Sequence, residues 1–144
     1  MARASLTGFE DLEKFLGKLA EPEKMAVKAV DAATPIAEKR LKAEITKAAN
    51  RKDRHGKPYS TGELAASIGH TKAGVNHLGV FAVVMPMGED KKGLRNAEKM
   101  AYLEYGVKSH GQAPHPVRQK TVNAVKTECQ RAMEETVYRE VDKL

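Results

Sequence analysis

The segment from residue 100 to residue 120, MAYLEYGVKSHGQAPHPVRQK, decides how the two halves of this chain are joined. It begins as an apolar, aromatic stretch with one embedded acid, Glu104, and it breaks at Gly106. A glycine directly after an apolar stretch suits a helix C-cap or a turn that needs a positive φ. Pro114 and Pro116 then fix the chain direction, because proline locks its own φ and restricts the residue before it. The sequence therefore predicts a corner between two packed elements.

Helical periodicity lies on both sides of this corner. Residues 96–105 are predicted to form a short helix that ends at the corner. After Pro116 the longest apolar stripe of the chain predicts a helix of about 40 Å, more than one small sheet can cover. We therefore expect the end of this helix to pack on N-terminal helices or on another subunit. The stripe consists of Val117, Val122, Val125, Cys129, Ala132, Met133, Val137, Val141 and Leu144.

Two helices are predicted before the corner, over residues 8–20 and 22–49, with a natural break at Pro22. The second helix is interrupted by Thr34 and Pro35. Either Pro35 kinks one long helix, or Thr34 caps a new one. We favour the kinked helix.

A short helix follows a basic loop at residues 50–59. Ser60 and Glu63 have the spacing of a capping box, and this predicts a helix in which Leu64 and Ile68 face inward. A small β region is expected after that helix.

The β region is predicted over residues 69–87. Residues 69–72 are expected to form a first strand and residues 73–76 a turn. Residues 78–85 are the most apolar run in the chain, and they predict a central strand that is covered on both faces and ends at Pro86. The charged, glycine-bounded residues 88–93 are predicted to form either a tight turn or a longer disordered excursion.

These elements predict one α+β domain over residues 1–144. Its helical N-terminal part is residues 1–50, and its α+β core with the long C-terminal helix is residues 60–144. We expect a small sheet packed against long N-terminal and C-terminal helices. The length of 144 residues and the hydrophobic fraction of 41% allow a core of modest size.

The charge balance is basic, with a formal net charge of +6. Such a balance favours acidic partners, including nucleic acid, without choosing among them. Arg51, Lys52, Arg54 and Lys57 are the densest basic group. They indicate either a solvated, mobile loop or a nonspecific contact for DNA phosphate or an acidic partner. The sequence has no short helix-turn-helix pattern and no aromatic platform for single strands.

No catalytic, cofactor-binding or metal-binding pattern stands out in the sequence. The five histidines lack the Cys/His spacing of a zinc site, and no phosphate-binding glycine loop is present. Glu104 lies in an apolar, aromatic context, but it has no nucleophile or second acid nearby, so we expect a paired acid at a turn or interface. Cys129 lies on the apolar stripe of the last helix, where a packed thiol is expected. The sequence therefore predicts a protein that is not an enzyme and that needs no cofactor.

The chain is expected to be a cytosolic product of its cell. Its first residues lack the apolar run of a signal peptide, and no stretch approaches the roughly 20 apolar residues of a membrane span. A lone cysteine excludes an internal disulfide framework. No membrane partner is therefore expected.

Two short motifs resemble those of the tail-component family of long-tailed bacteriophages and prophages, whose members are also described as neck, tail-completion or head–tail joining proteins. The first motif is Thr-Gly-x-Leu followed by Ser-Ile, here at residues 61–68. The second is an aromatic-x-Glu-aromatic-Gly segment followed by a proline-bounded helix start, here Tyr102, Glu104, Tyr105, Gly106 and Pro116. The family often has Phe after this proline and another proline soon after, where this chain has Val117 and Gln119-Lys120.

The resemblance implies an α+β fold in which a small, mostly antiparallel sheet packs against the long helices. It also implies structural work in a phage particle. It implies a subunit of a homo-oligomeric ring, with a hexamer as one candidate size, at the head-proximal end of the tail. The implied partners are head–tail connector and tail-tube proteins, and the implied location is the tail or neck of the virion, after assembly in the host cytoplasm. On this interpretation Tyr102, Glu104, Tyr105, Gly106, His115 and Pro116 form the fold corner or a subunit contact. The alternative function is a basic nucleic-acid-binding module.

Overall fold

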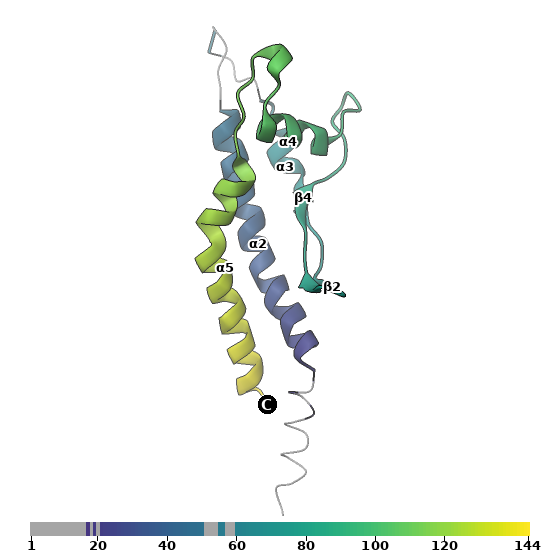
Figure 1. The fold of residues 1–144 in the computed structure, drawn as a ribbon, viewed down its shortest axis with the longest axis vertical. Helices are drawn as coiled ribbons and strands as arrows, with labels where there is room; N and C mark the ends of the chain where they lie inside the picture. Colours follow the sequence, from purple (N-terminus) through teal and green to yellow (C-terminus); the bar gives the residue numbers. More distant parts are fainter. Residues whose placement is uncertain (1–16, 18, 20, 51–54, 57–59) are drawn as a thin grey trace, which may run out of the picture.

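The structure is a computed structural model, and it describes residues 17, 19, 21–50, 55, 56 and 60–144. The described part has the predicted α+β fold (Figure 1), in which two long helices pack together and small antiparallel sheets lie beside them. The helix expected over residues 8–20 falls almost entirely outside the described residues.

The frame is an antiparallel pair of helices, α2 (Pro22–Ala49) and α5 (Val117–Asp142), which form the most extensive contact between elements (Figure 1). The start of α2 and the end of α5 lie at the same end of the molecule, where Lys28 and Glu140 form an ion pair. The helix α2 continues through Pro35, so Thr34 starts no second helix. Instead the Thr34 hydroxyl donates to the Val30 carbonyl oxygen at 2.7 Å.

The main core lies at the other end of the helix pair, where the short elements join it. Three helices and a strand contribute to this core, because each has its apolar face turned toward the same point. The fully buried members are Ile45 and Val117, each 1% exposed. The buried cluster consists of Leu41, Ile45, Ile68, Met100, Leu103 and Val117.

The strands differ from the prediction, because no single strand covers residues 78–85. The strand β1 (Ile68–His70) pairs with β4 (Val84–Pro86), whereas β2 (Gly74–Asn76) pairs with β3 (Gly79–Phe81); both pairs are antiparallel. The apolar run therefore splits between two sheets, since its first half pairs back on β2 and its second half pairs with β1. It is also not covered on both faces.

The turn predicted over residues 73–76 is wrong as well. Gly74 to Asn76 are the strand β2, and the turn is formed by His77 and Leu78. The Asn76 side-chain oxygen accepts a hydrogen bond from the Leu78 N–H at 2.8 Å, which closes this turn locally.

The short helix α3 (Glu63–Ser67) forms where it was predicted, but without the capping box. Gly62 occupies the N-cap with φ 78°, and no side chain caps the helix. The Ser60 hydroxyl oxygen instead accepts from the N–H of Gly62 itself, at 3.2 Å. Ile68 is buried and Leu64 packs against the core, so both face inward as predicted.

Candidate functional site

The predicted corner is a closed joint between α4 (Asn96–Tyr105) and α5. Gly106 ends α4 with φ 74° and ψ 173°, a backbone conformation that residues other than glycine rarely adopt. A Cβ at this position would lie 2.5 Å from the Gln112 carbonyl oxygen and 2.9 Å from the Pro114 nitrogen. The backbones of Val107 and Gln112 exchange two hydrogen bonds of 3.0 Å, which close the loop between them. Glycine is therefore required here by both conformation and space.

Glu104 is part of this joint and caps the long C-terminal helix. One of its carboxylate oxygens accepts a hydrogen bond from the Arg118 N–H in the first turn of α5, at 3.2 Å. A carboxylate at a helix N-terminus satisfies a free donor and interacts favourably with the helix dipole. The His115 N–H donates to the Leu103 carbonyl at 2.8 Å and fastens the loop to the end of α4. The corner residues of the second motif thus hold α4 and α5 together.

The aromatic residues of the same motif face outward. Tyr105 is 70% exposed and Tyr102 is 46% exposed. Pro116 is exposed at the N-cap position of α5. Part of the motif therefore builds the joint, and part of it is exposed to solvent.

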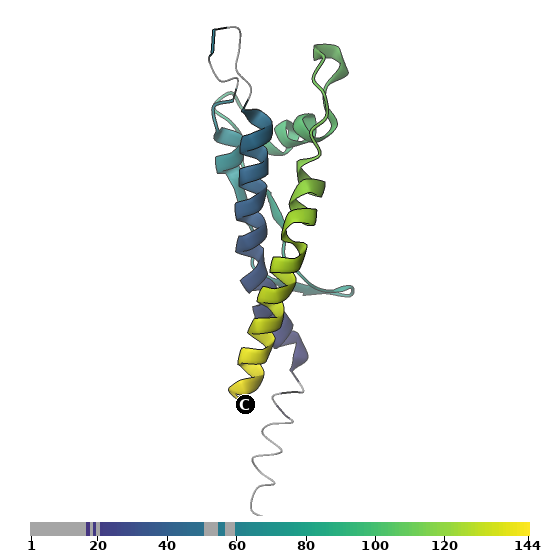
Figure 2. The same cartoon turned by 90° about the vertical axis from the view of Figure 1, so that its left-hand side faces the viewer.

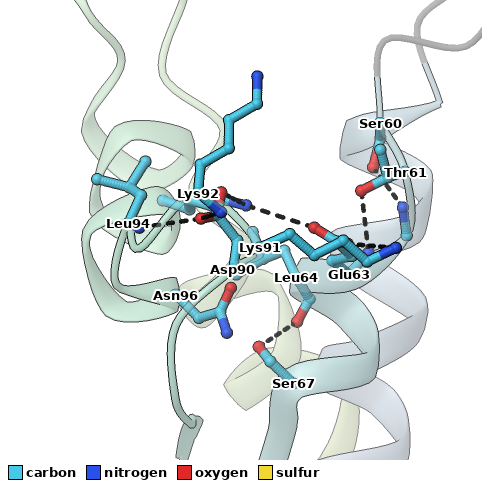
Figure 3. Close-up of polar contacts among 12 residues, drawn as sticks. Ser60, Thr61, Glu63, Leu64, Ser67, Asp90, Lys91, Lys92, Leu94 and Asn96 are labelled. Atoms are coloured by element: carbon cyan, nitrogen blue, oxygen red, sulfur yellow. Dashed lines mark hydrogen bonds and ion pairs between the residues drawn. The ribbon is translucent and has the colours of Figure 1, made fainter.

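The charged loop at residues 88–93 is a tight turn tied to α3 and α4 (Figure 3). One Asp90 carboxylate oxygen accepts from the Lys92 and Leu94 N–H groups, at 2.8 and 2.9 Å. The other oxygen lies 2.7 Å from the Lys99 ammonium nitrogen. The hydrogen bond from Lys99, and then that from the Leu94 amide, lower the pKa of Asp90 to about 2.

This turn borders a surface cleft of about 570 Å³ between α3 and α4. Glu63 on its rim faces Lys91 at 4.0 Å (Figure 3). Glu63 also lies 3.9 Å from the Lys99 ammonium nitrogen. Since Lys99 also pairs with Asp90, its charge is largely compensated within the chain. Lys99 is thus less suited to binding phosphate than an unpaired lysine would be.

The basic residues Arg51, Lys52, Arg54 and Lys57 lie outside the described residues. Their expected contact with DNA or an acidic partner remains a prediction.

Cys129 is half-buried between the long helices, with its sulfur 3.6 Å from the Ala33 carbonyl oxygen. Burial, and secondarily the charge of Glu128, raise the pKa of this thiol. A raised thiol pKa lowers the thiolate fraction and therefore the reactivity.

Ionisable side chains converge little in the described part of the chain. No group of three or more His, Cys, Asp or Glu residues there is placed to hold a metal ion. The ring of His70 contacts Glu38, which also pairs with Lys42 at 2.7 Å; the hydrogen bonds from Lys42 and then His70 lower the pKa of Glu38.

A mostly apolar groove lies beside the long helices, and sequence reasoning missed it. It has a volume of about 520 Å³, with α2 as its floor and α5, α4 and the β4 segment around it. Val122, predicted on the buried stripe of α5, opens into this groove and is 55% exposed. Thr121 is buried in its place, since Val117, Thr121 and Val125 follow the helix repeat that faces α2. Among the described residues that line the groove, Arg118 alone is charged.

A second apolar surface is the hairpin β2–β3, whose strands contact α2 and whose tip projects beyond the helix pair (Figure 2). Leu78 at its tip is 84% exposed, and Val75 and Phe81 are 47% and 44% exposed. Residues 73–88 contain no Lys, Arg, Asp or Glu, although such residues make up 31% of the chain. Exposed strand edges are normally protected by charges, so an uncharged projecting hairpin is typical of a contact surface. The absence of charged residues from 73 to 88 was therefore a signal in the sequence that could have indicated a contact surface.

Comparison with known proteins adds no assignment, because no family model, curated protein or solved structure matches this chain. In the described ranges, no helix combines the length and the hydrophobicity that a membrane crossing requires.

Proposed function

We propose that this chain is a structural subunit of a long-tailed phage or prophage particle, which works in a homo-oligomeric ring that completes the tail or joins it to the head. Its partners would be copies of itself, the head–tail connector and the tail-tube protein, in the tail or neck of the virion. The observation that carries this proposal is the apolar surface that the single chain leaves open, formed by the groove beside Val122 and the uncharged hairpin with Leu78 at its tip.

The arrangement of the two family-like motifs supports the same proposal. Leu64 and Ile68 from the first motif pack with Leu103, which lies inside the second motif, in one core. Gly106 and Glu104 then build the joint to α5. Part of each motif therefore has a structural role in one connected unit.

The open apolar surface also favours assembly on physical grounds. Monomeric proteins rarely expose large contiguous apolar patches, and larger ones mark interaction sites. A head-to-tail contact between identical subunits gives a closed ring when the rotation closes. A ring would share between neighbours the apolar surface that one subunit leaves exposed.

The test is the mass of the purified chain by light scattering, over a concentration series, at two salt concentrations, with and without duplex DNA. We expect a closed oligomer whose mass does not depend on DNA, or a monomer that forms a ring on purified tail tubes. A chain that stays monomeric in solution and also in the presence of tail tubes would refute the ring.

The basic charge provides the competing outcome. A monomer that binds duplex DNA tightly at low salt and releases it at high salt would favour the nucleic-acid-binding function. Reversing Arg51, Lys52, Arg54 and Lys57 to glutamate should abolish that binding. The same four changes should leave the ring intact if the proposed function is correct.

A further inference from the structure

We infer that the β2–β3 hairpin of one copy inserts Leu78 into the apolar groove of the next copy, and that this contact joins neighbouring subunits. The inference rests on the proposed ring and names the contact that builds it. It starts from the finding that one chain carries both an apolar projection and an apolar recess.

The projection has the shape and chemistry of an inserted element. Its tip residue Leu78 is 84% exposed, although burying a leucine is strongly favourable. The base of the hairpin is fixed to α2, because the Ala73 N–H donates to an Asp31 carboxylate oxygen at 2.7 Å. The strands of the hairpin also contact α2, but the exposed tip residue Leu78 lies beyond that support. A partner around the tip would bury Leu78.

The recess has matching chemistry. Val122, Val83 and Met85 line it and are 55%, 38% and 39% exposed, so apolar side chains remain open to solvent on its walls. Its volume of about 520 Å³ can hold several side chains. Among its described lining residues Arg118 alone is charged, and the hairpin brings no Lys or Arg that would repel it. The two surfaces are therefore both apolar, and their contact brings no two lysine or arginine side chains together.

A hairpin cannot fill the groove of its own chain in this fold. Val83 and Val84, which follow β3 after Ala82, belong to the groove, whereas the tip of the hairpin projects away from α5 in both views (Figures 1 and 2). The projection and the recess are thus different patches of one chain. Contacts of this type are heterologous, and they close into a ring or continue as a filament.

The first test uses single charge substitutions in the full-length chain. Leu78→Asp and Val122→Asp should each raise the dissociation constant of the oligomer by roughly ten- to a hundredfold, the effect of losing one buried aliphatic contact. Tyr138→Asp is the matched control, since Tyr138 is 68% exposed on α5 and does not line the groove. It should leave the dissociation constant unchanged. Circular dichroism checks that all three variants fold, as expected for exposed positions.

The second test identifies the two contacting surfaces. In a Cys129→Ala background, a Leu78→Cys protein and a Val122→Cys protein are mixed and oxidised. Hairpin insertion predicts a mixed disulfide between the two proteins, in large excess over either homodimer. Pairing of hairpin to hairpin would instead give the Leu78→Cys homodimer, and it would overturn the inference.

The possible failures can be told apart. A wild-type ring that both aspartate variants leave intact, without the mixed disulfide, overturns the hairpin contact and leaves the proposed function standing. A Leu78→Cys protein that cross-links only to the tail tube would show that another protein receives the hairpin, which also overturns the inference. A wild-type chain that never oligomerises, even on tail tubes, refutes the proposed function itself.

Discussion

Replacing Gly106 with alanine tests the account of the corner most directly. The new Cβ would lie 2.5 Å from the Gln112 carbonyl oxygen, 2.9 Å from the Pro114 nitrogen and 3.1 Å from the Ala113 carbonyl carbon. These are backbone atoms, so no flexible side chain can move aside. Either the loop between Val107 and Gln112 must shift, or the last turn of α4 must unwind.

The expected cost has two parts. A side chain held at φ 74° and ψ 173° costs about 1–3 kcal/mol in backbone strain. Overpacking against fixed neighbours adds about 1–3 kcal/mol. Gly106→Ala should therefore lower the free energy of unfolding by about 2–6 kcal/mol, a large part of the roughly 5–15 kcal/mol typical of a folded domain.

Gly111 provides the matched control in the same loop. It also has a positive φ, 64°, but a Cβ there would meet nothing within 4 Å. Gly111→Ala should cost only the backbone part, about 1–2 kcal/mol. Both alanines restrict the unfolded chain equally, so the difference between the variants reports the collision together with the greater backbone strain at the ψ of Gly106.

The assay is urea unfolding followed by circular dichroism, with the slope m compared between variants to confirm that the same surface is exposed. The reasoning would be refuted if Gly106→Ala cost no more than Gly111→Ala. Equal losses would mean that the loop gives way freely and that the corner is not a rigid joint.

Three further predictions concern the core, the helix interior and the pH dependence. Ile45→Ala should cost about 2–5 kcal/mol in urea unfolding, because Ile45 is 1% exposed in the main core and its removal leaves a cavity. Pro35→Ala should raise the melting temperature, because the exposed Pro35 gives no N–H to the Asp31 carbonyl and interior prolines cost helices up to about 3 kcal/mol. The folded pKa of Asp90 is lowered from 3.8 to about 2, so its stabilisation is complete above about pH 4 and is lost as the pH falls toward 2. Unfolding measured across that range should show a smaller decline for Asp90→Asn than for the wild-type chain.

Each of these predictions has a clear contrary result. A loss below 1 kcal/mol for Ile45→Ala would place that side chain outside the core. A lower melting temperature for Pro35→Ala would mean that the proline stabilises α2 through the unfolded chain more than it disturbs the helix. An unchanged acid profile for Asp90→Asn would mean that the contact with Lys99 does not persist in solution.

The helices could be predicted from the sequence because local signals place them. Pro22 and Pro116 mark helix starts, Gly106 marks a helix end, and the apolar repeat of 3.6 residues fills the intervals. The corner was predictable for the same reason, since proline and glycine act through the backbone of their immediate neighbours. Its closure by Glu104 was not, because that hydrogen bond spans fourteen residues.

The strands and the groove could not be predicted in this way. An apolar run such as residues 78–85 shows that apolar contacts are needed, but it does not show which strand each half pairs with. It also does not distinguish burial within one chain from burial between chains. The prediction assumed burial within the chain, and the exposure of Leu78, Phe81 and Met85 contradicts it.

The pairing of α2 with α5 delays folding until the C-terminal part of the chain has been synthesised. About 90 residues separate the end of α2 from the end of the helix that covers it. At a synthesis rate of 5–20 residues per second, α2 waits for roughly 5–20 seconds before its partner is complete. During that time Ala33, Leu41 and Ile45 have no α5 to pack against. The apolar face of α2 thus stays exposed until α5 has been synthesised. A nascent chain that lacks α5 should therefore be a target for chaperones.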